Sequence, residues 1–498
     1  MINENQYLLL CKLLNKILKS SESNLETISI PWLHIVREHP VVFKRYKNFF
    51  SKKTFFLYQK KIVNKVKWLF LILKSLRNKK NKYWYGSEKH EKNIDFLFIS
   101  AILNSNQFKS KEDFYYGKIP NYLKSKNKKV AISSIVSFKK AFFYFKKENK
   151  TPEINRYYFS ESLTYKEEKK IHLRLINESK RLKKISNEKK DVLESRAFYL
   201  SSIEANSMES HSNLRLDIQI SKIVKKLNPK AIISTYEGHA FERIIFNSAR
   251  SVNSKIICVS YQHTGVFRLS NAIKIKLSKN YNPNYILTSG KFAKEDLEKE
   301  KSLSSIKIYE LGSNRGLINE KKITTNRSIS KNSCLVIPEL FFSECNYLFD
   351  FSLKCACDNP NIYFIWRLHP GTNFKELLKQ NKKYKKIPKN IILSNDSLEN
   401  DIYKCNWVLY RGSTAVFKAL SHGLRPFYLT KKNEIPIDPL FKLNNWKKNV
   451  INSIDLISII KRDIDNNFKQ HKLNLKKSKE FCEKQFSKIN TEVIENLI

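Results

Sequence analysis

The chain has 498 residues, more than one hydrophobic core usually serves, so we expect two domains. Hydrophobic residues make up 41% of it, which excludes an intrinsically disordered protein. The formal net charge of +47 would attract an anionic membrane surface or nucleic acid. Basic residues are spread along the whole chain and form no nucleic-acid-binding motif. We therefore favour a compositional origin of the charge, rank membrane attraction second, and disfavour nucleic acid as a partner.

Residues 1–90 are Lys-rich and favour a helical N-terminal extension. The first residues lack the features of a signal peptide, and the most apolar window, 68–73, is far shorter than the ~20 residues of a membrane span. That window fits either a buried helix with a solvated Lys face, which we favour, or a basic helix lying in a membrane interface. The eight cysteines show no metal-ligand or disulfide spacing, which fits a reducing cytoplasm.

Short β-branched runs alternate with helix-length segments over residues 91–318, a pattern typical of βαβ units and a parallel sheet. A charged stretch, 150–195, interrupts this rhythm and predicts a solvated helical insertion. The predicted strands lie within 93–103, 129–138, 230–237, 255–263 and 285–290. These residues form the first predicted domain, a Rossmann-like one that would bind the acceptor.

A polar segment, 319–333, predicts a linker, after which the α/β rhythm starts again. The second set of predicted strands lies within 334–339, 361–370, 390–395, 406–413 and 425–430. We assign residues 319–440 to a second Rossmann-like domain, which would bind the donor, and 441–498 to a C-terminal helical segment. The expected fold class is therefore α/β, with two Rossmann-like domains facing a cleft and ligands bound at the carboxyl ends of the strands.

Two motifs follow strands of the second domain and suit a phosphate group. Arg367, His369 and Pro370 close an apolar strand: Arg supplies a fork of donors, His a hydrogen bond, and Pro a fixed turn. Gly412, Ser413 and Thr414 open a predicted helix, where backbone N–H groups favour anions. Simple capping of a strand end or of a helix start is the alternative for each motif.

In the first domain, Glu237 ends a predicted strand, and Gly238, His239 and Glu242 follow it in a turn and the start of a helix. A carboxylate at this edge of the sheet could act as a general base or orient an acceptor hydroxyl. The competing interpretation is a glutamate that only caps the following helix.

Two further groups would complete the cleft. Gln262 and His263 follow the next strand, and Gly312 and Ser313 form a small-residue turn before the linker. We expect no metal site, because no DxD triplet or His/carboxylate cluster is present. The sequence also lacks a Walker A loop, GxGxxG and GxSxG, and we expect no cofactor.

At these residues the chain resembles bacterial surface-carbohydrate and capsule glycosyltransferases of GT-B architecture, including CMP-Kdo and sialyl-type transferases. The matching features are Glu237, Gln262-His263, Gly312-Ser313, His369-Pro370 and Ser413-Thr414. The resemblance implies that Glu237 and His263 are catalytic and that the second-domain motifs bind the donor nucleotide. Thr264 stands where the family has a glycine, which is displaced here to Gly265, and Lys418 stands where many relatives carry a ribose-binding Glu.

The resemblance implies metal-independent transfer of a sugar, such as Kdo or a nonulosonate from its CMP form, to lipopolysaccharide or capsule. It implies a nucleotide-sugar donor and a lipid-linked or polysaccharide acceptor. We expect a cytoplasmic protein, with peripheral contact with the anionic inner membrane. A CDP-polyol phosphotransferase and a sugar-nucleotide epimerase of the same fold are alternatives. A polyanion-binding protein with a vestigial GT-B site is an alternative of another class.

Overall fold

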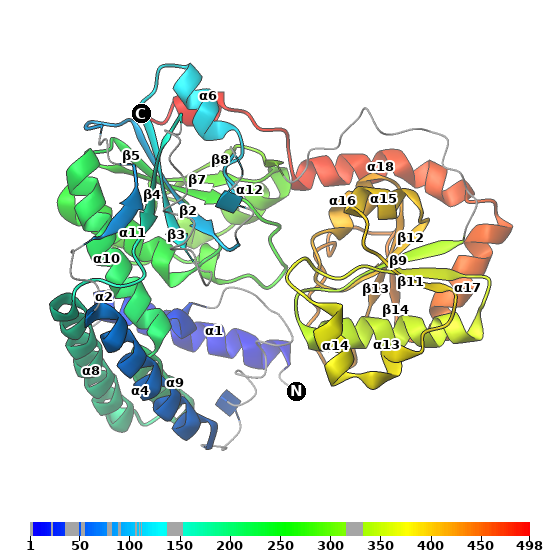
Figure 1. The fold of residues 1–498 in the computed structure, drawn as a ribbon, viewed down its shortest axis with the longest axis horizontal. Coiled ribbons are helices and arrows are strands. Elements are labelled where there is room, and N and C mark those ends of the chain that lie inside the picture. The colour runs from blue at the N-terminus through cyan, green and yellow to red at the C-terminus, as the bar shows by residue number, and fades with distance from the viewer. Residues whose placement is uncertain are drawn as a thin grey trace.

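The computed structural model describes residues 3–20, 23–34, 49–50, 55–76, 82–87, 91–104, 107–108, 110, 112–136, 153–314 and 332–498. Two α/β domains lie side by side, the N-terminal one on the left of Figure 1 and the C-terminal one on the right. Each is built around one mainly parallel sheet. The predicted α/β class, with the two Rossmann-like domains of GT-B architecture, is confirmed.

The N-terminal sheet has the strand order β1-β4-β3-β2-β5-β6-β7-β8, and only β1 runs antiparallel to its neighbour. Both faces are buried, because Phe96 and Phe98 of β2 pack into one hydrophobic cluster and Leu97 and Ile99 into another. The strands are β1 (Trp84–Gly86), β2 (Phe96–Ile102), β3 (Val130–Val136), β4 (Asn155–Phe159), β5 (Ala231–Thr235), β6 (Ile257–Gln262), β7 (Tyr285–Thr288) and β8 (Lys307–Glu310).

The C-terminal sheet is parallel throughout and has the order β11-β10-β9-β12-β13-β14. Numbered from β9, this is the 3-2-1-4-5-6 order of the Rossmann fold. Its strands are β9 (Ser333–Ile337), β10 (Tyr363–Trp366), β11 (Ile391–Leu393), β12 (Trp407–Tyr410), β13 (Arg425–Leu429) and β14 (Lys448–Val450). All five strands predicted for this domain are present, and β14 extends it beyond the predicted boundary at 440.

The N-terminal region is mainly helical, as predicted, and its helices pack on the first domain. Helix α1 (Glu4–Lys19) buries Leu10 and Leu14 in a cluster that includes Leu182 of α8 (Tyr165–Glu188), Phe198 of α9 (Val192–Ala205) and Ile437 of the C-terminal domain. The same part of the chain contributes β1 to the sheet. Beyond α1 it also forms α2 (Leu25–Ile28), the 3-10 helix η1 (Pro31–Leu33) and α4 (Phe55–Leu76).

The predicted insertion at 150–195 is also integral to the domain. It contains β4, which pairs with β1 and β3, and then α8 (Tyr165–Glu188), which packs along α9 (Val192–Ala205). Despite its many charges, α8 buries Ile171, Leu175 and Leu182. The prediction of a solvated insertion was wrong, because these apolar side chains recur at helical spacing among lysines that stay outside.

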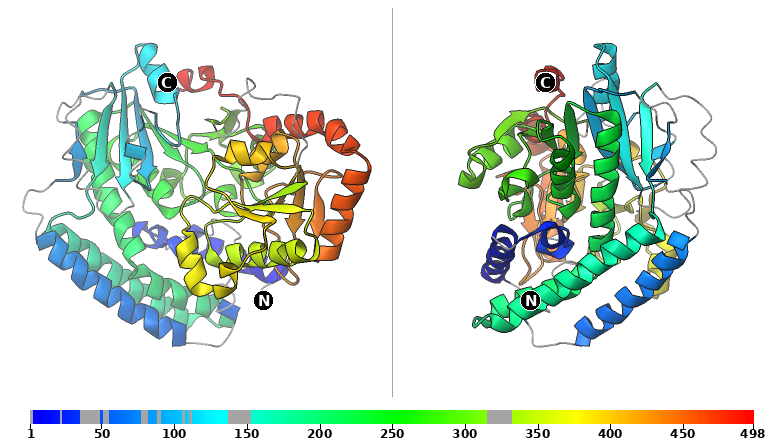
Figure 2. Two further views of the ribbon diagram at one scale, coloured as in Figure 1. Left: turned by 45° about the vertical axis from the view of Figure 1, so that its right-hand side comes forward. Right: turned by 90° about the vertical axis from the view of Figure 1, so that its left-hand side faces the viewer.

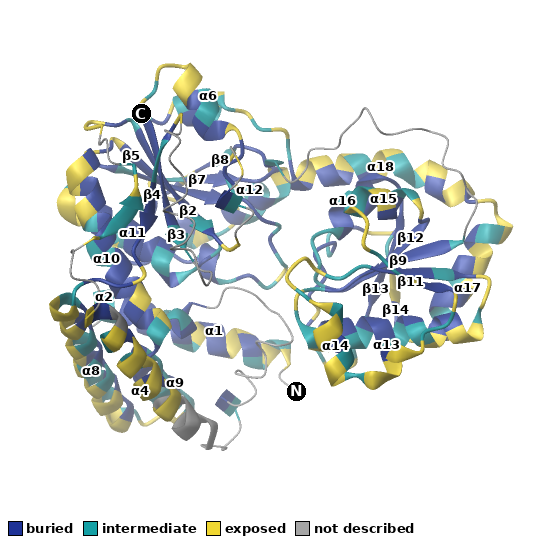
Figure 3. Ribbon diagram, in the orientation of Figure 1, coloured by how far each residue is buried: buried dark blue, intermediate teal, exposed yellow. Residues whose placement is uncertain are grey.

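Other helices cover the faces of the two sheets, and the strands are the most deeply buried elements in Figure 3. In the N-terminal domain these are α6 (Ile119–Ser125), α10 (Met208–Leu227), α11 (Ala240–Val252), α12 (Lys291–Glu298), η2 (Ala272–Lys274), η3 (Lys279–Tyr281) and η4 (Lys301–Leu303). In the C-terminal domain they are α13 (Phe342–Asp358), α14 (Phe374–Gln380), η7 (Lys382–Lys385), α15 (Leu398–Tyr403), α16 (Val416–Ser421) and α17 (Ser453–Asp465).

The C-terminal segment returns to the first domain. Helix α18 (Lys469–Gln485) packs on α16, whereas Ile494 of α19 (Glu492–Glu495) and Leu497 lie in a core cluster of the N-terminal sheet. Gly290 marks the crossing, since a Cβ there would lie 2.6 Å from the carbonyl oxygen of Gln485. Residues 441–498 contain the helices α17, α18 and α19, in agreement with the predicted helical segment, and they contact both domains.

Candidate functional site

The two sheets reverse their strand order at defined points, where open α/β sheets place their ligands. In the C-terminal sheet this point lies between the carboxyl ends of β9 and β12, and Gly412–Thr414 directly follow β12. In the N-terminal sheet it lies between β2 and β5, and Glu237 follows β5. Both groups of predicted site residues therefore occupy the switch point of their sheet.

The two switch points belong to facing edges of the domains. Gly265, in the loop after β6, lies close to Phe417 of α16, the helix that follows Thr414; a Cβ on Gly265 would be 3.6 Å from the Phe417 ring. Lys442 of the C-terminal domain also bonds Asp296 of α12 at 2.7 Å. The carboxyl edge of the first sheet thus meets the start of α16 in the second domain.

Buried Arg411 holds the loop that carries Gly412, Ser413 and Thr414. Its Nε donates to Glu344 at 2.7 Å and its Nη1 to the Leu429 carbonyl at 2.7 Å. Nη2 pairs with Glu434. This network fixes the backbone directly before the loop, and sequence analysis missed it because its carboxylates come from distant segments.

The hydroxyl groups of Ser413 and Thr414 do not cap a helix, which was the alternative to phosphate binding. Helix α16 begins at Val416, and its N-cap is Ala415, which makes no side-chain cap. Both side chains are partly exposed and bond to no other residue that the structure describes. Gly412 is required by close packing, since a Cβ there would lie 2.1 Å from Oε1 of Glu339. The loop therefore presents two hydroxyl groups at the switch point.

His369 presents one ring nitrogen outward. Its Nδ1 accepts a hydrogen bond from the Gly371 backbone N–H at 3.1 Å. Because a backbone N–H can only donate, the proton of the neutral ring resides on Nε2, which is left as a donor. The ring reaches the surface, yet partial desolvation lowers its pKa below the usual value, which favours this neutral form. Pro370, beside it, is exposed and shapes the turn.

Arg367, predicted as a phosphate ligand, also bonds within the protein through its Nη1 atom. Its Nη1 donates to Asp401 at 2.7 Å and to the Asp396 carbonyl at 2.6 Å. Asp401 is almost fully buried and also accepts from Ser394 at 2.6 Å. The guanidinium group thus neutralises a buried carboxylate and fixes the start of α15, which is a positioning role.

The two donor-side motifs are separated by one strand. His369 follows β10 and Gly412–Thr414 follow β12, and β9 lies between these two strands. The loop after β9 joins them: Glu339 lies against Gly412, and the carbonyl of Leu340 accepts from Thr372 at 2.8 Å. His369 and Ser413–Thr414 therefore flank the Glu339–Leu340 loop at a single edge of the sheet.

Lys418, at the position noted for its departure from the family pattern, pairs with Glu399 of α15. Glu399 is 42% exposed, and Arg367 also contributes to the lowering of its pKa, after the larger effect of Lys418. A carboxylate thus stands near this position, although it comes from another helix.

Glu237 is presented by a turn that Glu242 organises. The buried Glu242 carboxylate accepts from the backbone N–H groups of Glu237, Gly238 and His239 at 2.8–3.1 Å. Burial raises the pKa of Glu242 to about 7, whereas His239 and the amide donors oppose the rise. Because the folded-state pKa of Glu242 lies above its usual value, ionisation of this carboxyl opposes folding, and its contribution to stability falls as the pH rises toward 7. Gly238 has a φ of +91°, and a Cβ there would lie 2.3 Å from that of Ala272.

The Glu237 side chain, 18% exposed, lies 3.5 Å from Nε2 of His239. It lines a cavity of about 770 Å³ at the carboxyl edge of β2 to β5. Two charged residues of this wall were not predicted: Glu161 follows β4, which lay within the predicted insertion, and Arg215 lies inside α10 and not after a strand. Arg215 pairs with Glu168 at 2.7 Å. The cavity combines two carboxylates, an imidazole and a paired cation, which suits a polyhydroxylated ligand.

Gln262 and His263 are buried, with exposures of 1% and 2%. Oε1 of Gln262 accepts from the Ser289 hydroxyl at 3.2 Å, and His263 packs edge-on against Tyr115, which lines the cavity. His263 therefore lies one layer behind the cavity wall. This placement assigns both residues to support of the wall, in contrast to the contact with substrate that was predicted.

Gly312 and Ser313 hold the returning C-terminal segment and do not line this cavity. The Ser313 N–H donates to the Ser487 carbonyl at 2.9 Å. Gly312, with a φ of +92°, lies so close to Lys488 that a Cβ would be 2.3 Å from its carbonyl oxygen. Their small size permits the chain crossing between the domains.

No family model and no curated protein sequence matches the chain. Solved structures, in contrast, do match the chain. They include the UDP-GlcNAc 2-epimerase of Methanocaldococcus jannaschii, 14% identical over 74% of this chain and 92% of that one, with a TM-score of 0.42. The glycotransferase of kitacinnamycin is 9% identical over 82% and 99%, with a TM-score of 0.46. Acinetobacter baumannii MurG is 9% identical over 81% and 99%, with a TM-score of 0.42. At this level of similarity these proteins carry no information on the reaction of this chain.

Proposed function

We propose that the protein is a glycosyltransferase that moves a sugar from a nucleotide-activated donor to a carbohydrate acceptor. One observation carries the proposal: Glu237 and the Ser413–Thr414 loop lie at the switch points of two sheets whose carboxyl edges face each other, and His369 follows β10 at the same edge as that loop. A base on one side and phosphate-binding donors on the other are the two parts that such a transfer needs.

In the proposed reaction an acceptor hydroxyl enters the 770 Å³ cavity and gives its proton to the Glu237 carboxylate. The acceptor oxygen forms a bond to the anomeric carbon while the bond from that carbon to the donor phosphate oxygen breaks. The electron pair leaves with the phosphate. Nε2–H of His369 and the hydroxyl groups of Ser413 and Thr414 donate hydrogen bonds to the charge that develops there.

We propose a CMP-activated 3-deoxy-ulosonic or nonulosonic acid as the donor, on the basis of the sequence resemblance at His369-Pro370 and Ser413-Thr414. The proposed acceptor is a growing lipopolysaccharide or capsule chain. We further propose that transfer needs no metal ion, because neutral donors on the protein supply the stabilisation of the leaving phosphate. Turnover should then persist in excess EDTA.

The test is a screen of purified protein against CMP-, UDP- and CDP-activated donors with an oligosaccharide acceptor. One class should give acceptor-dependent release of nucleotide. His369→Ala should reduce transfer about 10- to 100-fold, the equivalent of one hydrogen bond to a charged group. Leu473→Ala, an exposed change on α18, is the control. Unchanged turnover in His369→Ala would refute the assignment of the nucleotide site. An epimerised donor without transfer would show that the protein is an epimerase and not a transferase.

A further inference from the structure

Helix α4 turns an apolar face outward. The side chains on this face are between 46% and 68% exposed, and Phe70 is the most exposed of them. At about 100° per residue they fall on one side of the helix. This outward stripe consists of Ile62, Val63, Val66, Leu69, Phe70, Leu73 and Leu76.

The opposite face packs on the protein and is partly polar. Asn64, Leu71 and Ser75 are buried. The Trp68 ring stacks on His172 of α8 at a centroid distance of 3.7 Å. Figure 2 shows α4 along α8 at the rim of the N-terminal domain. The prediction of a buried helix with a solvated Lys face was wrong, since the helix is anchored by its less apolar face and exposes the more apolar one.

Positive charge surrounds the stripe. Lys65 and Lys67 are exposed and, by helical geometry, fall on its two margins. In the sequence no acidic residue occurs between Glu38 and Glu88. An apolar band with basic margins matches the interface of an anionic bilayer, where acyl chains meet negative headgroups. A second copy of this chain is a poorer match, because two basic stripes would repel each other.

The stripe adjoins the cavity that holds Glu237. Lys67, Phe70 and Leu71 of α4 line that cavity together with His239. A bilayer seated on the stripe would therefore lie beside the cavity mouth. Among the described residues no helix is long and apolar enough to cross a membrane, so α4 would lie along the surface.

We propose that the outward stripe of α4 docks the protein on an anionic phospholipid bilayer and brings the Glu237 cavity to acceptors anchored there. The second half of this statement rests on the proposed transferase function, whereas the docking itself does not. The stripe supplies apolar burial, and its lysines supply selectivity for anionic headgroups.

The experiment is co-sedimentation of the full chain with vesicles of phosphatidylcholine alone or mixed with phosphatidylglycerol. We expect binding to the mixed vesicles, loss of binding at about 1 M salt, where charges are screened within about 3 Å, and an at least about tenfold weaker partition for Leu69→Glu/Leu73→Glu. The matched control is Ile454→Glu/Leu473→Glu, which places the same charges on exposed apolar sites of the C-terminal domain.

Light scattering and circular dichroism of each variant accompany the assay. Equal loss of binding in both double variants, or full binding by Leu69→Glu/Leu73→Glu in a folded state, would overturn the proposal. The proposal would also be overturned if the wild type were a dimer and Leu69→Glu/Leu73→Glu a monomer, because the stripe would then be a subunit interface. Vesicle binding without any sugar transfer would leave the docking surface intact and reject the transferase, so the two failures are distinguishable.

Discussion

The Nδ1 atom of His369 lies 3.1 Å from the backbone nitrogen of Gly371, and this contact fixes the tautomer of the ring. We predict that nitrogen-15 NMR of the free protein shows His369 protonated on Nε2 at neutral pH. Its titration should fall below the usual histidine range, because desolvation lowers its pKa. The His369→Gln variant identifies the signal. A ring that carries protons on both nitrogens, and is therefore mainly positively charged, at pH 6.5 would contradict the assigned hydrogen bond.

Substitutions of Glu237 and Glu242 should have different effects, the first on sugar transfer and the second on the stability of the fold. Glu237→Gln should abolish transfer while nucleotide binding and the urea midpoint stay unchanged. Glu242→Gln should lower the free energy of unfolding by about 2–3 kcal/mol, because an amide group cannot accept at both ends of the turn. Urea denaturation and calorimetric binding of CMP check both. A large loss of stability in Glu237→Gln would show that it holds the turn instead.

Arg411→Lys should destabilise the C-terminal domain by about 2–3 kcal/mol, since an ammonium group cannot bond Glu344, Leu429 and Glu434 together. Nucleotide affinity should also fall, because the Ser413–Thr414 loop loses its anchor. The control is Arg268→Lys, whose guanidinium group pairs with Glu4 and is 41% exposed. That exchange should cost less than about 1 kcal/mol. Equal effects of the two exchanges would argue against the anchor.

The Lys418–Glu399 pair suggests that the ribose contact comes from α15. If Glu399 accepts from a ribose hydroxyl, Glu399→Gln should weaken CMP more than 2′-deoxy-CMP, by about 0.5–1.5 kcal/mol for one hydrogen bond. Titration calorimetry with both nucleotides measures this difference. A uniform loss for both would instead indicate that the variant acts only by freeing Lys418.

Acid should destabilise the protein through a buried neutral histidine. Burial lowers the pKa of His34 to about 3, and its Nε2 donates to the Ile28 carbonyl at 2.9 Å. Because the unfolded chain takes up the proton near pH 6.5, this stability is complete above that pH and falls below it, by up to about 1.4 kcal/mol per pH unit. His34→Gln should flatten the dependence between pH 6.5 and 5. An unchanged slope would exclude His34 as a source.

The sequence predicted the parallel strands whose apolar runs are continuous, such as β5 and β9. It missed β4, because Asn155 and Arg156 open that strand and a charged helix follows it. Site residues were located by their position after strands, which places Glu237 and Ser413 correctly at sheet edges. Spacing could not reveal that Arg367 is bonded by Asp401, because that pairing depends on how α15 folds back.

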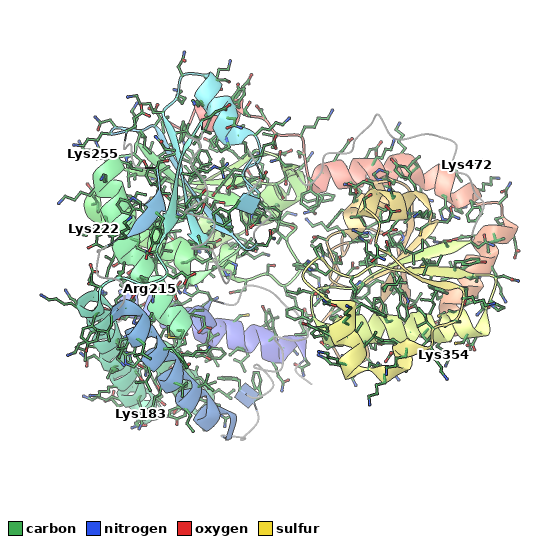
Figure 4. The ribbon with its side chains drawn as sticks, in the orientation of Figure 1. Lys183, Arg215, Lys222, Lys255, Lys354 and Lys472 are labelled. Atoms are coloured by element: carbon green, nitrogen blue, oxygen red, sulfur yellow. The ribbon has the colours of Figure 1, made fainter. Side chains whose placement is uncertain are left out.

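The sequence predicted the net charge of the protein but not how the charged side chains are distributed over its surface. Figure 4 shows Lys183 and Lys222 on the N-terminal domain and Lys354 and Lys472 on the C-terminal one, so positive side chains cover both domains. The stripe on α4 was visible in the sequence as an apolar window. Which face it turned outward depended on contacts such as Trp68 with His172, and these are set by tertiary packing.

The crossing at Gly290 and Gly312 means that the chain links the two domains twice, once between β8 and β9 and once after α18. A single proteolytic cut between Asn314 and Asn332 would therefore not release two independent pieces. The C-terminal fragment would still keep Ile494 and Leu497 inserted in the core of the other. The nicked protein should elute as one particle under native conditions and separate only in denaturant.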